Sequence, residues 1–276
     1  MATLNAAECF GLKDRGAIAP GYRADIVLLD DLKDFNVNRV WVEGKLVAED
    51  GKYLPEIKKY DISTVKGSVV LKDFSKDKFK MNLKSNKVNV IGILPGGVVT
   101  EKLTAEIELD ANGEFVWNPD EDIVKVAVLE RHKGTGNVAC GFLKGYGIKS
   151  GAVALSIAHD SHNIIVVGVN DEEMEAAVNA LVAQEGGIVL VKDGKIVESM
   201  PMPIAGLMSD QSGEWVDEKL TAIHEKAYSE LGICGDVEPV MTLCFMSLIV
   251  IPAIKITDTG LFDVTTFSFI PVEINE

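Results

Sequence analysis

The spacing of apolar residues predicts two amphipathic helices in the second half of the chain. Over residues 171–185 apolar side chains recur every three or four positions, which places them on one face of an α-helix. Asn170 or Asp171 can cap the start of this helix, and a Gly186-Gly187 pair can end it. The same spacing over residues 213–231 predicts the second helix.

Short apolar runs predict a series of strands around these helices. They lie at residues 88–93, 102–109, 123–129, 152–158, 164–169 and 248–251, with a hairpin of residues 188–191 and 196–197. A weaker alternation over residues 79–83 suggests one more strand. Strands mixed with helices in this way predict an α/β (α+β) domain with a mixed sheet.

The first 50 residues follow a different pattern. Residues 2–12 predict a short helix, Ile26–Leu29 a buried strand, and residues 37–47 a hairpin that turns at Glu43-Gly44. One strand and one hairpin are too small to be stable alone, so they are expected to complete a sheet supplied by something else. A polar, Lys-rich segment over residues 51–87 places a domain boundary near residue 60, which gives domains of residues 1–60 and 61–276.

The charge and the cysteines narrow the class of protein. The chain has 42 acidic and 27 basic residues and a net charge of −15, which argues against binding to nucleic acid or to an anionic membrane surface. Its four cysteines form no C-x-x-C pair and are expected to be reduced, buried thiols. With no signal-like N-terminus and no apolar stretch long enough to span a bilayer, we expect a cytoplasmic protein.

The loop between the strands predicted at 152–158 and 164–169 is a candidate site. His159 and His162 could bind a borderline divalent metal ion, although on an extended strand their rings would face opposite sides, so a turn is required. Asp160, Ser161 and Asn163 could instead line or support the mouth of an active site. A hydrogen-bonded loop with a purely structural role is the third interpretation.

A second candidate follows the strand predicted at 123–129. Charged residues at the end of a buried strand, before a Gly-rich turn, often face a ligand. The alternative is an Asn/Gly turn that carries solvated charges. The Gly134-x-Gly136 pattern alone is too short to indicate a phosphate loop. The candidate residues here are Glu130, Arg131, His132, Lys133 and Asn137.

Two segments near the N-terminus carry a family resemblance. Residues 2–7 (Ala-Thr-Leu-Asn-Ala-Ala) and 16–27 (Gly-Ala-Ile-Ala-Pro-Gly-Tyr-Arg-Ala-Asp-Ile-Val) resemble the segment that follows the catalytic barrel in the amidohydrolase superfamily. In that superfamily the strands after this segment return to a β-sandwich begun by the N-terminus. Dihydroorotases, deacetylases and deaminases share the pattern, so it indicates a superfamily and not a substrate.

Three further segments are more specific. Residues 130–137, 156–163 and 202–209 resemble, in this order, the C-terminal domain of bacterial adenine deaminases. The resemblance implies metal-dependent hydrolysis of adenine to hypoxanthine and ammonia, with manganese or iron held by a barrel of roughly 250 residues. The chain contains no H-x-H motif, so we expect that barrel, which would also bind the adenine, to be missing.

The resemblance therefore places no catalytic residue in this chain. We expect the chain to be inactive without the barrel and to form a homo-oligomer. The resemblance assigns no metal ion to the residues of this chain. The alternative is a non-catalytic binding or assembly module. Residues 202–209 form an apolar loop that could cover a neighbouring subunit or the barrel, or could pack in the core.

Overall fold

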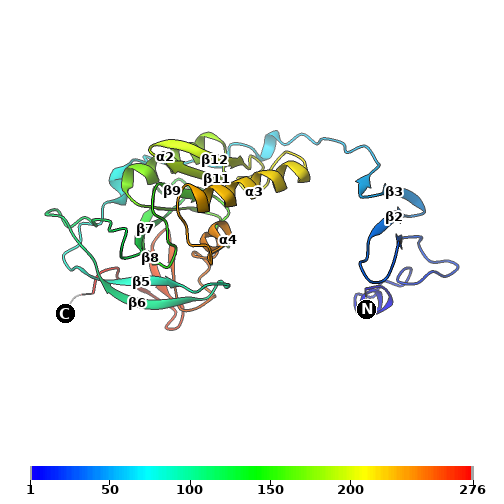
Figure 1. Cartoon of the computed structure of the whole chain (residues 1–276), viewed down its shortest axis with the longest axis horizontal. Helices are drawn as coiled ribbons and strands as arrows, with labels where there is room; N and C mark the ends of the chain where they lie inside the picture. The colour runs from blue at the N-terminus through cyan, green and yellow to red at the C-terminus, as the bar shows by residue number, and fades with distance from the viewer. Residues whose placement is uncertain (1, 275–276) are drawn as a thin grey trace. The chain divides into compact units, whose positions relative to one another are not determined.

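The computed structural model describes residues 2–274 and divides the chain into two compact units. The smaller unit runs up to Asp61, and the larger one begins at Ile62 (Figure 1).

The smaller unit is a sheet without a core. Helix α1 (Leu4–Cys9) precedes four antiparallel strands in sequence order: β1 (Ile26–Leu29), β2 (Val37–Val42), β3 (Lys45–Glu49) and β4 (Lys52–Tyr53). The β2–β3 pairing confirms the predicted hairpin. Of the described residues in this unit only Ala7 is buried, while Ile18 is 88% exposed. An unburied sheet of this size cannot account for its own stability.

The larger unit is built on a mixed sheet, which confirms the predicted fold class. Its strand order is β12-β11-β9-β10-β7-β8-β5-β6, and every neighbouring pair is antiparallel except β5 and β8. The strands are β5 (Lys87–Ile93), β6 (Thr100–Glu106), β7 (Ile123–Leu129), β8 (Val138–Lys144), β9 (Ala152–Leu155), β10 (Ile164–Gly168), β11 (Gly187–Lys192) and β12 (Lys195–Pro201).

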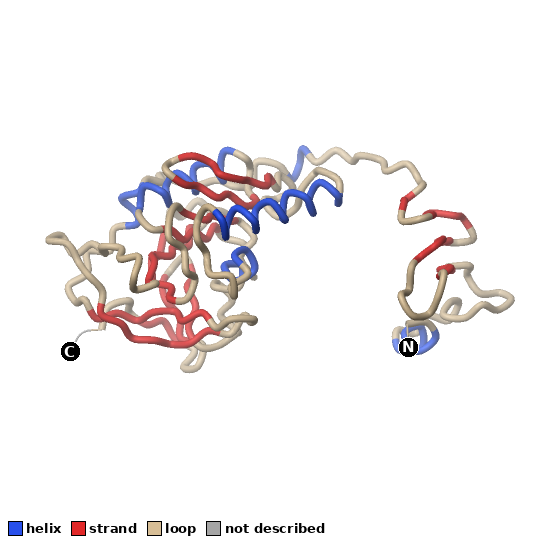
Figure 2. The backbone as a smooth tube through the Cα atoms, viewed as in Figure 1, coloured by secondary structure: helices blue, strands red, loops and turns tan. Residues whose placement is uncertain are grey.

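Both faces of this sheet are covered (Figure 2). Helix α2 (Asp171–Ala183) packs on one face, together with the 3-10 turn η2 (Lys76–Phe79). The opposite face carries α3 (Gly213–Ser229), α4 (Pro239–Cys244) and the small sheet β13 (Ile254–Thr257), β14 (Gly260–Asp263) and β15 (Ser268–Ile270). A second 3-10 turn, η1, spans Ser63–Val65. Because the central strands are buried on both sides, β9 and β10 carry apolar runs without a polar residue, and β7 is interrupted only by Lys125.

Several predicted elements agree with the structure and others do not. Helices α2 and α3 confirm the predictions over 171–185 and 213–231. The strand predicted at 79–83 is wrong, because η2 turns there and buries Phe79 completely. The strand predicted at 248–251 is also wrong, because its backbone bonds locally, from Leu248 to Phe245 and from Ile251 to Leu248. Strands β8, β13, β14 and β15 were not predicted.

The cysteines also depart in part from expectation. Cys244 is buried and Cys140 is half-buried, but Cys9 and Cys234 are exposed. All four are free thiols. None of the helices between residues 2 and 274 is long and apolar enough to cross a membrane.

Candidate functional site

Glu130, at the end of β7, organises the loop that follows it. Its carboxylate accepts hydrogen bonds from the backbone N–H groups of His132, Lys133 (2.6 Å) and Thr135 (2.9 Å), and from the Thr135 hydroxyl (3.1 Å). Burial favours the neutral acid and would raise the pKa of Glu130, but these four donors outweigh it and hold the pKa at about 2. Glu130 is therefore ionised, and its carboxylate holds the backbone of residues 132–135 in place.

Arg131 joins three separate segments of the chain. Its side chain is buried, and its Nε donates to the carbonyl of His162 (2.5 Å). Its two terminal nitrogens donate to the carbonyls of Ser68 (3.2 Å) and Ala205 (3.1 Å). Burial lowers its pKa, and among the described residues no carboxylate forms an ion pair with it. The guanidinium thus fixes the connector, the 159–163 loop and the 202–209 loop against one another.

Ser156 and Val69 also hold the 202–209 segment next to Arg131, through contacts with Gly206. The Ser156 hydroxyl donates to the carbonyl of Gly206 at 2.6 Å. Gly206 has a φ of +72°, and an added Cβ would lie 2.7 Å from Val69 and 3.1 Å from Arg131. Only glycine fits this position. The three segments that carry the resemblance to adenine deaminases are therefore in contact, although they are far apart in sequence.

Three of the four histidines gather on the loops around Arg131. The Nε2 of His132 lies 2.7 Å from the carbonyl oxygen of Ser161. The ring of His159 packs against His162 (5.6 Å between centroids) and against Phe245 (4.9 Å). Burial, followed by the nearby cationic groups, lowers the pKa of His162. His162 is thus neutral at pH 7, and its Nδ1 is buried with no hydrogen-bond partner among the described residues.

These residues do not form a metal site in this structure. The carboxylate of Asp160 lies 3.9 Å from Nδ1 of His159, and its side chain is 82% exposed. Across residues 2–274 no three His, Cys, Asp or Glu side chains come together in a way that could hold a metal ion. Within the described part of the chain, His159 and His162 therefore have no third protein ligand beside them.

Asp258, in the turn between β13 and β14, completes the cluster. Its two carboxylate oxygens accept hydrogen bonds from the side-chain amides of Asn163 and Asn137, each at 3.3 Å. It thereby links the two candidate loops. Nothing in the sequence singles out Asp258, because Asp-Thr-Gly at 258–260 has the composition of any hairpin turn.

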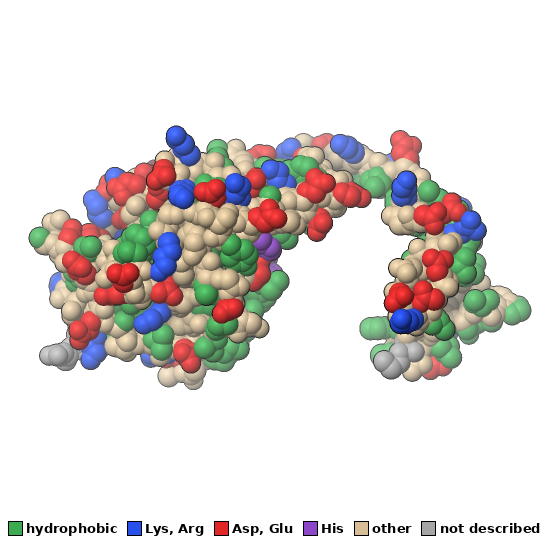
Figure 3. All heavy atoms as spheres, viewed as in Figure 1, with side chains coloured by type: hydrophobic (Ala, Val, Ile, Leu, Met, Phe, Trp, Pro, Cys, Tyr) green, Lys and Arg blue, Asp and Glu red, His purple; other side chains and the backbone are tan. Residues whose placement is uncertain are grey.

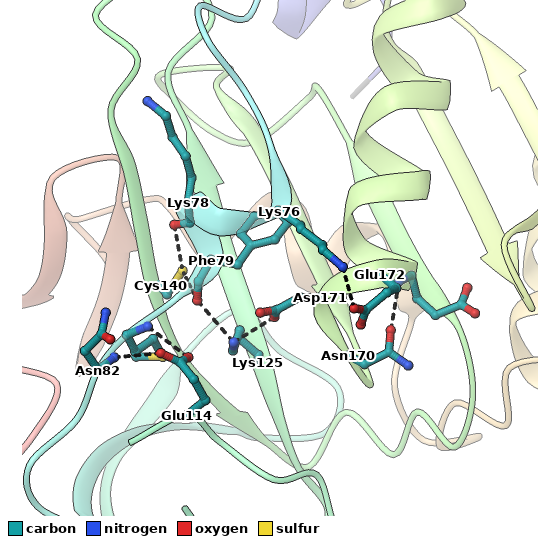
Figure 4. A network of polar contacts seen from close by, with 12 residues as sticks. Lys76, Lys78, Phe79, Asn82, Glu114, Lys125, Cys140, Asn170, Asp171 and Glu172 are labelled. Atoms are coloured by element: carbon teal, nitrogen blue, oxygen red, sulfur yellow. Dashed lines mark hydrogen bonds and ion pairs between the residues drawn. The ribbon is translucent and has the colours of Figure 1, made fainter. Parts of the chain in front are cut away.

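The Lys-rich connector is tied to the larger unit by polar contacts, and Figure 4 shows those of Lys76 and Phe79 with Glu172 and Lys125. The amine of Lys78 donates to the carbonyl of Gly136 (2.7 Å), inside the loop organised by Glu130. The buried amine of Lys125 donates to the carbonyl of Phe79 (3.1 Å) and to Asp171 (2.7 Å), at the start of α2. Residues 62–87 are thus an integral part of the larger unit, whereas the sequence suggested a connector.

The predicted site residues fall into two groups. The first is a buried frame, and the second offers side chains at the surface, where a ligand or another protein could reach them. The frame consists of Glu130, Arg131 and Asn163. The exposed or half-buried group consists of His132, Lys133, Asn137, His159, Asp160, Ser161 and His162.

Comparison with known protein families identifies the larger unit. The sequence model described as "Adenine deaminase C-terminal domain" matches residues 97–268. The chain belongs to this adenine deaminase C-terminal domain family. A second model, described as "Amidohydrolase family", matches residues 1–47. Both matches confirm the resemblance inferred from the sequence, and the first range contains all three motifs and Asp258.

Individual relatives of this family match almost the whole chain. It is 64% identical to "Adenine deaminase 2" of Desulfotalea psychrophila over 273 residues, which is 99% of this chain and 47% of that protein. It is 48% identical to "Adenine deaminase" of Ligilactobacillus salivarius, covering 100% of this chain and 48% of that protein. The chain therefore spans about half the length of the curated relatives it matches.

The role of Glu130 in this family domain gives a first prediction. Glu130→Gln should lower the free energy of unfolding by about 1–3 kcal/mol at pH 7, because the amide replaces a charged acceptor of four hydrogen bonds. The folded-state pKa of about 2 lies below the ordinary value of 4.5. The contribution is thus complete above pH 4.5 and is lost as the pH falls towards 2.

Urea unfolding of the chain at several pH values measures this effect. The exposed Glu106→Gln on β6 is the matched control and should change stability little. The interpretation is wrong if Glu130→Gln and Glu106→Gln have equal midpoints at pH 7.

Proposed function

We propose that this chain is the C-terminal part of a metal-dependent adenine deaminase that hydrolyses adenine to hypoxanthine and ammonia. The observation that carries the proposal is the 64% identity, over 99% of the chain, to a protein named adenine deaminase 2. In this proposal the metal, manganese or iron, and its ligands belong to the amidohydrolase portion that makes up the other half of the relatives. The chain alone is inactive.

The smaller unit supports this proposal because its described residues form almost no hydrophobic core. Its four-stranded sheet buries only Ala7 among its described residues, and its family match is to amidohydrolases. We propose that residues 1–60 complete a β-sandwich whose remaining strands lie in the amidohydrolase portion. Burial of side chains such as Ile18 and Leu32, which are at least 80% exposed here, would supply the missing core.

The larger unit has a different role in the proposal. Its exposed histidines and Lys133 line or support the mouth of the active site, and the buried frame of Glu130, Arg131 and Asn163 fixes their position. None of these residues is proposed to perform the chemistry. The four free cysteines support a reducing compartment, the cytoplasm, for an enzyme of purine metabolism that we expect to be a homo-oligomer.

A chimera tests the proposed function. The matching 273 residues of the Desulfotalea psychrophila protein are replaced by those of this chain, and ammonia release from adenine is followed with manganese or iron added. We expect turnover within about tenfold of the unmodified relative, a barrier change of no more than about 1.4 kcal/mol. The isolated chain should release no ammonia above background.

Two results would contradict the proposal. A folded, metal-loaded chimera that leaves adenine unchanged would indicate a non-catalytic module. Metal-dependent turnover by the isolated chain would show that the barrel is not required.

A further inference from the structure

One segment of the larger unit is unusually apolar at its surface. Residues 239–254 contain no Asp, Glu, Lys or Arg, in a chain whose charged residues amount to 25%. They form α4 and the turns that follow it. Met241 on α4 is 55% exposed, and Val250 in the turns is 67% exposed. Half of the segment is buried in the unit, and the exposed apolar side chains that remain on a charge-free segment are typical of an interaction site.

The loop between β5 and β6 extends this surface. The backbone of Thr100 is paired with that of Pro252 (3.0 Å) and Ala253 (2.9 Å), which places the 46% exposed Val99 beside the turns. A cavity of about 300 Å³ lies between this loop and α4. Two acidic residues, Asp236 and Glu238, lie in its lining, whose apolar members are Ile93, Leu94, Pro95, Val98, Val237 and Met241. We call α4, the turns 245–253 and the loop 94–99 the α4 face.

The α4 face borders the histidine cluster. At the end of α4, the carbonyl of Cys244 accepts a hydrogen bond from the backbone N–H of His159 (2.7 Å). The ring of Phe245 packs on that of His159 at 4.9 Å. In Figure 3 the histidine side chains of the larger unit lie beside a group of hydrophobic side chains. Whatever covers the α4 face is therefore brought next to the candidate site.

We propose that the α4 face docks on the amidohydrolase portion of the enzyme, so that the histidine cluster meets that portion at the edge of the contact. This inference rests on the proposed function. The relatives carry 52–53% of their length outside the matched region, in the same polypeptide, so this partner is always present at high effective concentration. The lack of charge over 239–254 suits the dehydrated core of a protein contact, and Asp236 and Glu238 beside it would repel an anionic polymer such as nucleic acid.

Hydroxyl-radical footprinting tests the docking without relying on activity. Oxidation of Met241 is compared between the isolated chain and the chimera described above, with the 70% exposed Phe267 as an internal reference. If Met241 passes from 55% exposed to nearly buried, its oxidation should fall by about fivefold in the chimera, because the core of an interface excludes water. Oxidation of Phe267 should stay the same.

A pair of variants sharpens this test. Val250→Asp places a charge on the α4 face and should restore the oxidation of Met241 in the chimera. Ile196→Asp, at a 57% exposed position on β12, is the matched control and should leave Met241 protected. Both substitutions are at exposed positions, so the isolated variants should keep the far-ultraviolet circular dichroism of the parent chain.

Measuring Met241 oxidation and deaminase activity on the same chimera tests the docking and the proposed activity independently. Protection of Met241 in an inactive chimera would support the docking and contradict the proposed activity. An active chimera in which Met241 stays as reactive as in the isolated chain would overturn the docking. Protection that already occurs in the isolated chain, and that grows with its concentration, would also overturn it, because a second copy would then cover the face.

Discussion

Replacing Arg131 by methionine is expected to lower the free energy of unfolding of the larger unit by about 3 kcal/mol, about 1 kcal/mol for each of three carbonyls that lose their donor. The side chain is buried, and its guanidinium is the hydrogen-bond donor for the carbonyls of His162, Ser68 and Ala205. Methionine fills much of the volume but leaves these carbonyls without that donor. A loss of this size is a large fraction of the stability of an ordinary domain.

Urea unfolding, followed by the fluorescence of Trp117 and Trp215, measures this loss. Lys133→Ala, two residues away on the same loop and exposed, is the control and should cost less than about 0.5 kcal/mol. Arg131→Lys keeps the charge but not the planar set of donors, so we expect an intermediate value. This variant remains informative if the methionine variant does not fold. Equal midpoints for all three variants and the parent would contradict the central position we assign to Arg131.

Replacing Lys255 by methionine should have the opposite effect and stabilise the chain. Lys255 lies on β13 and is fully buried, and its amine donates to the carbonyl of Val98 at 2.8 Å. Burial lowers its pKa from 10.5 to about 8, so the folded chain holds the ammonium at a cost of about 3 kcal/mol at pH 7. Loss of the hydrogen bond offsets about 1 kcal/mol of this, which leaves a net gain of about 2 kcal/mol.

The pH dependence identifies the cause of this gain. Because the pKa is lower in the folded chain, the unfolded chain binds the proton more tightly between pH 8 and 10.5. The free energy of unfolding of the parent should therefore rise over this window, and the advantage of Lys255→Met should be complete below pH 8 and shrink above it. Thermal unfolding of both proteins from pH 6 to 10 measures the difference. If the parent is more stable than the variant at pH 7, interactions of the folded chain must offset the cost of burying the Lys255 ammonium.

The periodicity of apolar residues predicted correctly those helices and strands that have one kind of environment along their whole length. Helices α2 and α3 have one apolar face each, and strands such as β7 and β10 are buried on both sides, so the pattern and the environment agree. It was insufficient for residues 248–251. A run of four apolar residues is compatible with a strand or with buried turns, and here the local hydrogen bonds of the turns prevail. Strand β8 was missed because Gly141 interrupts a run of small residues.

The same distinction applies to the candidate site. The sequence alone identified the loops at 130–137 and 159–163, the family, and the apolar character of 202–209, because these depend on the kinds of residue in short segments. It could not assign roles within them. Glu130 and Arg131 have the composition of ligand-binding residues, yet both are buried in the frame. That outcome depends on partners distant in sequence: Arg131 is 74 residues from Ala205, and Asn163 is 95 residues from Asp258. Periodicity and turn chemistry are local properties, whereas burial of a charge requires donors and acceptors that only the folded chain brings together.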